Sequence, residues 1–209
     1  MAGLFITFEG GEGTGKSTQA KLLAERLRGS GRTVVSTREP GGTAEAEAIR
    51  TLLVTGDTAR WSARAEALLN YAARDSHLIG VIRPALARGD IVICDRFMDS
   101  TRAYQAYAGD CPLALIDRLE ADVLGATRPV LTLIFDMPSE AGLVRARERG
   151  AGEDRYERKG ADFHRRLRDG FLAIAKADSK RCRIIDASGA INGVTAAVWR
   201  AVEPVLANG

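Results

Sequence analysis

The sequence has few cysteines, no long apolar run and almost no surplus of charge of either sign. Its three cysteines, Cys94, Cys111 and Cys182, form no Cys-x-x-Cys pair, so we expect reduced thiols, with Cys94 and Cys182 packed in strands. No stretch approaches the roughly 18 apolar residues that a transmembrane helix needs. The net charge is only +3, whereas a nucleic-acid-binding face needs clustered basic residues. We therefore expect neither a disulfide-rich secreted protein nor a membrane or nucleic-acid-binding protein.

The composition is typical of a folded cytoplasmic domain. Of the 209 residues, 45% are hydrophobic and 27% are charged, which suits a core and argues against global disorder. An apolar run begins at Leu4, so we expect no signal peptide before it. We find no internal repeat, low-complexity tract or linker. Residues 1–209 are expected to form one cytoplasmic domain.

The most informative stretch lies between residues 4 and 18. After an apolar run come Gly10, four further residues, Gly15, Lys16 and Ser17, which is the G-x-x-x-x-G-K-[ST] spacing of a phosphate-binding loop. Glycines let the backbone N–H groups form a concave anion site, and the first turn of the following helix adds partial positive charge. The lysine can reach the β- and γ-phosphates, and the hydroxyl can ligate Mg²⁺. The residues expected to bind the nucleoside triphosphate are Gly10, Gly11, Glu12, Gly13, Thr14, Gly15, Lys16, Ser17 and Thr18.

Strand-like and helix-like segments alternate along the chain. We expect strands at 4–8, 33–37, 91–94, 131–135 and 183–185. We expect helices at 19–27, 44–53, 62–87, 101–107, 113–124, 139–148, 161–177 and 194–206, with a bend at Pro84 in the longest. This alternation predicts an α/β phosphate-loop fold, with a five-stranded parallel sheet and helices on both faces. Ligands of such folds bind beyond the carboxyl ends of the strands.

The carboxyl ends of the predicted strands carry polar residues. These are Glu9, Arg38, Asp95 with Arg96, Asp136 and Asp186. The chain has no N-K-x-D guanine signature, and the strand 91–94 runs into Asp-Arg rather than the Asp-Glu of large ATPases. An arginine at this point suits an enzyme that must neutralise two anionic nucleotides. The pattern favours a small kinase.

Several motifs follow one another in a characteristic order and spacing. They are Phe8-Glu-Gly-Gly-Glu-Gly-Thr-Gly-Lys-Ser-Thr18, Thr37-Arg-Glu-Pro-Gly-Gly42, Tyr71-Ala-Ala-Arg74, Asp95-Arg-Phe97, Ser100-Thr-Arg-Ala-Tyr-Gln105, and Arg145-x-Arg-x-Arg-Gly150 with Asp154-Arg155. With these motifs the chain resembles the bacterial thymidylate kinases along nearly its full length. The resemblance implies Mg²⁺-dependent transfer of the γ-phosphoryl group of ATP to thymidine monophosphate, by a homodimer.

The resemblance also implies catalytic roles. Lys16 and Arg96 would stabilise charge on the moving phosphoryl group, and Glu12 resembles the residue that faces the acceptor sugar hydroxyl. One subtype of the family places a further catalytic arginine in the phosphate loop, and the other places it in a short mobile lid, here about 145–158. The loop of this chain has no arginine, so we expect the lid-arginine subtype. Arg149 is the first candidate and Arg155 the second.

Further residues match the acceptor and metal sites of that family. The expected acceptor-site residues are Glu9, Arg38, Arg50, Asn70, Arg74, Asp95, Arg96, Ser100, Thr101, Tyr104 and Gln105. Among them, Arg74 matches a contact to a thymine carbonyl, Thr101 a contact to the ring nitrogen, and Tyr104 a tyrosine beneath the deoxyribose. Ser17 and Asp95 are the expected Mg²⁺ ligands. Adenine is expected between the lid and the loop 186–189.

One position departs from the family pattern. Asn70 stands where the family usually has a phenylalanine that stacks on thymine, and such a stack contributes about 1–3 kcal/mol. Either Asn70 pairs with the base or another ring stacks on it.

Two other functions are compatible with the motifs. One is a kinase for another nucleoside monophosphate or for a deoxynucleoside. The other is a non-catalytic nucleotide-dependent switch, which would bind ATP without acceptor-dependent transfer.

Overall fold

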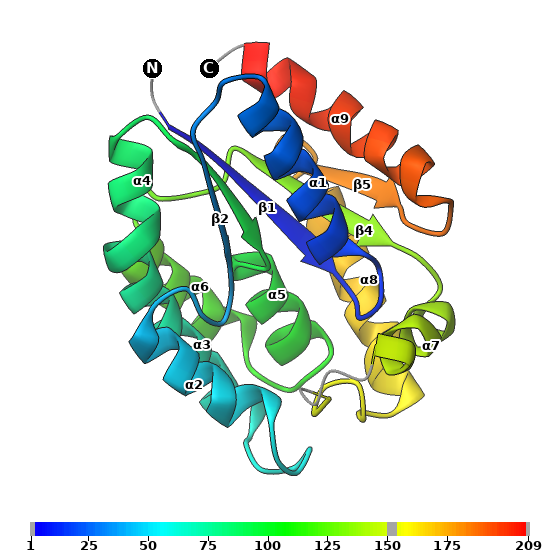
Figure 1. Ribbon diagram of the computed structural model, residues 1–209. Helices are drawn as coiled ribbons and strands as arrows, with labels where there is room; N and C mark the ends of the chain where they lie inside the picture. Colours follow the sequence, from blue (N-terminus) through cyan, green and yellow to red (C-terminus); the bar gives the residue numbers. More distant parts are fainter. Residues whose placement is uncertain (1–2, 150–153, 208–209) are drawn as a thin grey trace.

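A parallel sheet lies at the centre of the protein (Figure 1), whose computed structural model describes residues 3–149 and 154–207. Its strands are β1 (Leu4–Gly10), β2 (Val34–Arg38), β3 (Ile91–Asp95), β4 (Leu131–Asp136) and β5 (Cys182–Asp186). They lie in the order β2-β3-β1-β4-β5, and every neighbouring pair is parallel. The predicted five-stranded parallel sheet is confirmed.

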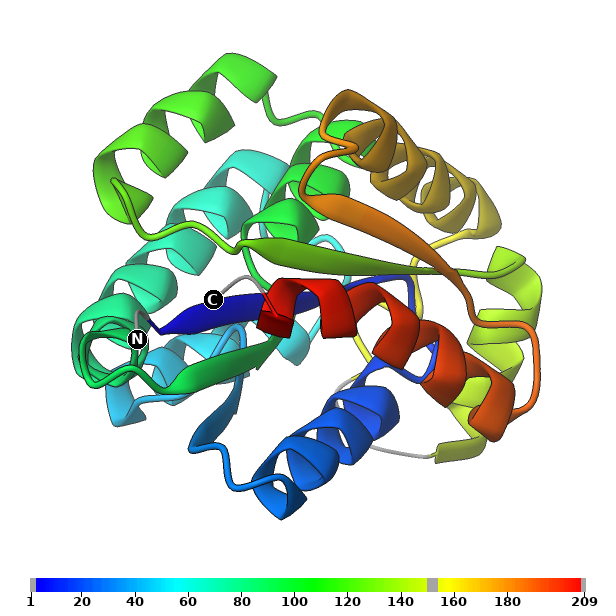
Figure 2. The ribbon, with the colours of Figure 1, turned by 90° about the horizontal axis from the view of Figure 1, so that it is seen from above.

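Helices cover both faces of this sheet, as predicted. They are α1 (Lys16–Gly29), α2 (Ala44–Val54), α3 (Ala63–His77), α4 (Arg83–Ala87), α5 (Met98–Thr101), α6 (Leu113–Leu124), α7 (Ser139–Arg149), α8 (Ala161–Ala177) and α9 (Ile191–Ala207), with π-helical turns η1 (Leu78–Ile82) and η2 (Arg102–Tyr107). Figure 2 shows α1 and α9 on one face of the sheet and α3, α6 and α8 on the other. No helix in the described ranges combines the length and apolar character that crossing a membrane requires.

The predicted helix 62–87 is interrupted. Ser62 caps its first part, α3, since its hydroxyl oxygen accepts from the N–H of Ala65. The π-helical turn η1 then separates α3 from α4, and Pro84 lies in the first turn of α4. Proline lacks the N–H that would continue an α-helical ladder, so the widened turn lies where that donor is missing. The predicted helix 101–107 likewise changes from α5 to the π-helical η2.

The core follows from the alternation of side chains along each strand. Phe5 of β1 packs with residues of α3, α4 and α6, whereas its neighbours Ile6 and Phe8 pack with residues of α1 and α9. Successive strand residues point to opposite faces, so one strand supplies both apolar layers. Cys94 and Cys182 lie in strands as predicted, and both are buried free thiols, Cys94 in the layer with Phe5 and Cys182 among residues of α8.

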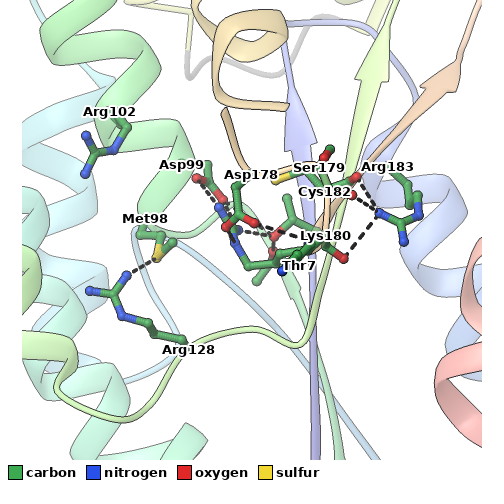
Figure 3. A network of polar contacts seen from close by, with 12 residues as sticks. Thr7, Met98, Asp99, Arg102, Arg128, Asp178, Ser179, Lys180, Cys182 and Arg183 are labelled. Carbon is green, nitrogen blue, oxygen red and sulfur yellow. Dashed lines mark hydrogen bonds and ion pairs between the residues drawn. The ribbon is translucent and has the colours of Figure 1, made fainter. Parts of the chain in front are cut away.

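A buried polar network fastens α5 to the sheet. Asp99 of α5 accepts from Arg181 Nη1 at 2.6 Å and from Nη2 at 3.0 Å. Arg181 also donates to Thr132 Oγ1 at 2.6 Å and to Asp178 Oδ2 at 2.8 Å, and the hydroxyl of Thr132 is 2.7 Å from that of Thr7. Asp99, Asp178 and Thr7 converge in Figure 3 from α5, the chain before β5, and β1. The network thus fixes the helix that follows the carboxyl end of β3.

We expect Asp99→Asn to lower the free energy of unfolding by about 3 kcal/mol, because it removes the more buried of the two carboxylates that pair with the guanidinium of Arg181. Urea unfolding measures this loss. Glu25→Gln is the control, since its carboxylate lies 3.9 Å from Lys21 on the exposed surface of α1 and such pairs contribute about 1 kcal/mol or less. Equal small losses in both variants would contradict the prediction.

Candidate functional site

The phosphate loop connects β1 to α1 as the sequence predicts. Gly13 and Gly15 have φ of 68° and 83°, in the left-handed region that favours glycine. A Cβ at Gly13 would lie 1.8 Å from the main-chain oxygen of Gly142, so only glycine fits there. Lys16 is buried, and its Nζ donates to the oxygen of Gly11 at 2.6 Å and to Thr14 Oγ1 at 3.1 Å. The loop therefore holds its lysine inside its own curve.

Ser17 and Asp95, the predicted Mg²⁺ ligands, lie together. Ser17 at the start of α1 donates through Oγ to Asp95 Oδ2 at the end of β3. A hydroxyl and a carboxylate oxygen beside a phosphate loop are the hard ligands that Mg²⁺ prefers. The described residues contain no group of three or more His, Cys, Asp or Glu side chains that could hold a metal ion. The donor set fits an ion whose other ligands come from phosphates and water.

Arg96 links the phosphate loop to α5. Its φ of 69° makes it the one non-glycine residue with positive φ in the described chain, and such conformations concentrate at functional sites. Nη1 donates to the oxygen of Gly10 at 2.9 Å and to Ser100 Oγ at 3.2 Å, and Nη2 donates to Glu12 Oε1 at 3.1 Å. The same Glu12 oxygen accepts from Tyr104 OH at 2.5 Å. The guanidinium is thus held at the mouth of the phosphate loop.

Opposite charges stabilise one another within this cluster. Burial raises the pKa of Glu12, but the charges of Arg96 and Lys16 outweigh it and lower that pKa to about 2. Burial, together with Arg96, lowers the pKa of Lys16 to about 8. Glu12 is therefore an anion at neutral pH between two cations, and Lys16 keeps most of its charge. This is an electrostatic centre suited to polyanions.

Glu9 lies beneath the site and not at its surface. It is fully buried, and it accepts from the N–H of Phe97 at 2.8 Å and from Ser100 Oγ at 2.5 Å. It is absent from the residues that line the cavity described next. The prediction that Glu9 contacts the acceptor is therefore wrong. Instead, its carboxylate holds the main chain that follows Arg96.

A cavity of about 240 Å³ opens beside the phosphate loop. Residues 12–17 form one wall. The predicted acceptor residues that line it are Arg38, Arg50, Asn70, Arg74, Asp95, Arg96, Ser100, Thr101, Tyr104 and Gln105. The structure thus brings residues from five separate motifs to one cavity. It adds lining residues that the sequence analysis missed: Glu39, Pro40, Val54, Phe97, Tyr156 and Glu157.

Arg74 is the cation at the deep end of this cavity. Only 1% of it is exposed. Nε donates to Glu39 Oε2 at 2.7 Å, and Nη2 donates to Thr101 Oγ1 at 3.0 Å. Nη1 is buried without a hydrogen-bond partner in the described part of the chain. A buried donor of this kind calls for an acceptor, and a carbonyl in the cavity would supply one. Glu39, within the Arg-Glu-Pro-Gly-Gly motif, is the counter-charge whose role the motif alone did not reveal.

Two further arginines line the cavity from its β2 side. Arg38 Nη2 is 3.1 Å from Glu47 Oε2, and Arg50 Nη1 donates to the oxygen of Pro40 at 2.9 Å. Arg38 ends β2, and Arg50 lies on α2. Both predicted positions therefore face the cavity, with side chains oriented by neighbouring oxygens.

Asn70 is held by its own helix. Its Nδ2 donates to the main-chain oxygen of Glu66 at 2.8 Å. Phe97, Tyr104 and Tyr156 also line the cavity, so an aromatic wall is present although position 70 is not a phenylalanine.

The structure describes the side chain of only one of the two predicted catalytic arginines of the lid. Arg149 is the last residue of α7, but its side chain lies outside the described residues, as do residues 150–153 of the predicted lid. Arg155 is fully buried and donates to the oxygens of Asp57, Leu53 and Thr58 and to Glu66. The prediction of a catalytic Arg155 is wrong, because its guanidinium is enclosed by protein acceptors.

The predicted adenine region lies beside α7. Arg145 donates through Nη1 to the oxygen of Ala187 at 3.2 Å and through Nη2 to that of Ser188 at 3.5 Å. The loop after β5 and the helix that leads into the lid are therefore in contact. The adenine assignment itself stays a prediction.

The model of the thymidylate kinase family matches residues 8–198. The chain belongs to the thymidylate kinase family. It is 59% identical to the thymidylate kinase of Caulobacter vibrioides over 196 residues, which are 94% of each chain. It is 51% identical to that of Ruegeria pomeroyi over 200 residues, 96% of this chain and 94% of the relative.

A solved structure of a family member has the same fold. The crystal structure of thymidylate kinase from Ehrlichia chaffeensis superposes with a TM-score of 0.78 and 37% sequence identity, covering 97% of this chain and 99% of the other. Thymidylate kinases are ATP-dependent nucleotide kinases, so membership of the family favours a kinase over a non-catalytic switch.

We expect Glu9→Gln to flatten the pH dependence of stability. Burial and the Asp99 charge raise the pKa of Glu9 from 4.5 to about 7, so the folded state binds a proton that the unfolded chain has lost in this window. Wild-type stability should therefore fall as pH rises from about 4.5 to about 7, with a Glu9 contribution of up to about 1.4 kcal/mol per pH unit. Urea unfolding at a series of pH values measures the slope. The same slope in both proteins would contradict the prediction.

Proposed function

We propose that the cavity and the phosphate loop together bind the two nucleotides of the thymidylate kinase reaction. In this reaction the γ-phosphoryl group of ATP passes to thymidine monophosphate, giving thymidine diphosphate and ADP; membership of the family assigns it to this chain. The observation that carries the proposal is the position of Arg96, which joins the phosphate loop to α5 and lines the same cavity as Arg74. One cation therefore faces both nucleotide positions.

The reaction requires positioning and charge stabilisation rather than covalent chemistry. Lys16 lies within the phosphate loop, where it can neutralise the β- and γ-phosphates of the donor. Arg96 lies where the acceptor phosphate would meet the donor. The acceptor phosphate is already anionic at neutral pH, so no strong general base is needed. Charges fixed before the reaction stabilise the transition state without reorganisation.

We propose Ser17 and Asp95 as the protein residues of a Mg²⁺ site. Their oxygen atoms are adjacent beside the loop, and the ion would neutralise phosphate charge there. Ser17 begins α1 and Asp95 ends β3, so the site would rest on two rigid elements.

Arg74 and Tyr104 are the proposed determinants of acceptor recognition. The Nη1 donor of Arg74 is directed to a thymine carbonyl, and Thr101, which already accepts from Arg74, is the proposed partner of the ring nitrogen. The ring of Tyr104, fixed by its hydrogen bond to Glu12, would lie under the deoxyribose and leave little room for a 2′-hydroxyl. Selectivity for a deoxyribonucleotide follows.

We also propose a cytoplasmic homodimer. Leu68 of α3 and Ile79 of η1 are 46% and 60% exposed, so the long helical segment has apolar side chains available for a second copy.

The reaction is tested by coupled ADP release with thymidine, deoxyuridine and guanosine monophosphates. We expect thymidine monophosphate to give the highest kcat/KM, because Arg74 and Thr101 are arranged for its base. A higher value for another monophosphate would indicate a different kinase. ATP binding without acceptor-dependent ADP release would indicate a switch.

We propose Arg149 as the catalytic arginine of the lid. Arg149→Ala should lower kcat by about 10³-fold, the effect of removing an arginine from a transferring phosphoryl group, with little change in the KM for thymidine monophosphate. Arg147→Ala is the matched control, because Arg147 is an exposed arginine two residues earlier on α7. Near wild-type turnover of Arg149→Ala in steady-state assays would rule out the assignment.

A further inference from the structure

Glu66, in the first turn of α3, is a buried carboxylate at which several parts of the chain meet. Only 1% of it is exposed. Its Oε1 accepts from Arg155 Nη2 at 2.6 Å and lies 3.7 Å from Lys159 Nζ. Its Oε2 accepts from Gln105 Nε2 at 2.8 Å. Both oxygens therefore accept from residues outside α3, and two cations lie beside the carboxylate charge.

Arg155 extends this cluster to the chain between α2 and α3. Its Nε, Nη1 and Nη2 donate to the oxygens of Asp57 at 2.8 Å, Leu53 at 3.0 Å and Thr58 at 3.1 Å. Its own N–H donates to the oxygen of Val54 at 3.3 Å. One guanidinium thus joins the segment 154–160 to the end of α2 and to Glu66.

Three residues that line the acceptor cavity hold their positions through Glu66. Gln105 donates directly to its carboxylate, and the same Nε2 is 3.4 Å from Tyr156 OH. Tyr156 follows Arg155 in sequence, so the Arg155–Glu66 pair places its ring. Asn70 donates to the main-chain oxygen of Glu66. Glu66 itself does not line the cavity.

We infer that Glu66 is a positioning residue for the acceptor pocket: its carboxylate orders Gln105 and, through Arg155, Tyr156. The inference rests on the proposed function of this cavity as the thymidine monophosphate site. The negative charge is needed for two reasons. A neutral amide at position 66 offers a single acceptor oxygen to two donors, and it leaves the guanidinium of Arg155 buried without a counter-charge.

Steady-state kinetics of Glu66→Gln test the inference. We expect the KM for thymidine monophosphate to rise by about tenfold, comparable to the loss of a charge-assisted hydrogen bond, while the KM for ATP stays within about twofold. Glu120→Gln of α6 is the matched control. Glu120 is 4% exposed and pairs with Arg102 at 2.9 Å and Arg128 at 3.4 Å. The control variant therefore also removes a buried helical carboxylate that pairs with two cations. Both KM values of this variant should stay near those of the wild type.

An unchanged KM for thymidine monophosphate in Glu66→Gln, or an equal rise in both KM values, would overturn the inference. If Glu66→Gln does not fold, Arg155→Lys replaces it. A lysine keeps the charge opposite Glu66 but has one nitrogen for three carbonyl oxygens, so the acceptor KM should still rise, and an unchanged value overturns the inference. Failure of the wild-type protein to release ADP in response to thymidine monophosphate would refute the proposed function instead.

Discussion

The ion pair between Arg96 and Glu12 is the interaction on which the arrangement of the site depends. A kinase that transfers a phosphoryl group between two nucleotides must bind two anions side by side. It therefore needs several cations at one edge of its sheet, and those cations repel one another. Glu12 lies between Lys16 and Arg96 and keeps its charge because both cations lower its pKa to about 2. Arg96 in turn adopts a left-handed backbone conformation. Its cost, of order 1–3 kcal/mol, is met by the hydrogen bonds that the side chain and main chain make to β1 and the phosphate loop.

Similar buried pairs hold the remaining walls of the cavity. Arg74 is paired with Glu39, and Asp99 of α5 is paired with Arg181. Buried ion pairs add little net stability, because desolvation cancels most of the Coulomb attraction. Their effect here is on geometry, since a guanidinium with several fixed acceptors has one orientation. In each pair the carboxylate follows a strand or begins a helix: Glu39 follows β2, and Asp99 lies in the first turn of α5.

Much of the fold follows from sequence patterns, and the cavity follows from where the motifs lie. Strand β3 was predictable because its apolar run Ile91–Cys94 is continuous, and the helices 113–124 and 161–177 have the predicted bounds. Residues of separate motifs meet because parallel strands bring their carboxyl ends to one edge. Burial was not predictable in the same way. Arg155 lies in a charged, glycine-flanked stretch typical of an exposed loop, yet it is enclosed, because its partners come from residues 53–66. Glu9 follows an apolar run as a site residue would, but the fold of residues 96–100 covers it.

On α3 a row of polar side chains includes Asn70, the position at which the family usually has a phenylalanine. Glu66, Asn70 and Arg74 are spaced four residues apart, so they lie on one face of the helix, toward η2 and the end of β2. The middle residue of this row donates to the main chain of the first, which a phenylalanine cannot do. Asn70 is therefore held against the first turn of its own helix, and the aromatic surface of the cavity comes from Phe97, Tyr104 and Tyr156. In the proposed acceptor site, Arg74 of α3 would supply a hydrogen-bond donor to the base, and the rings that would stack on it belong to other segments of the chain.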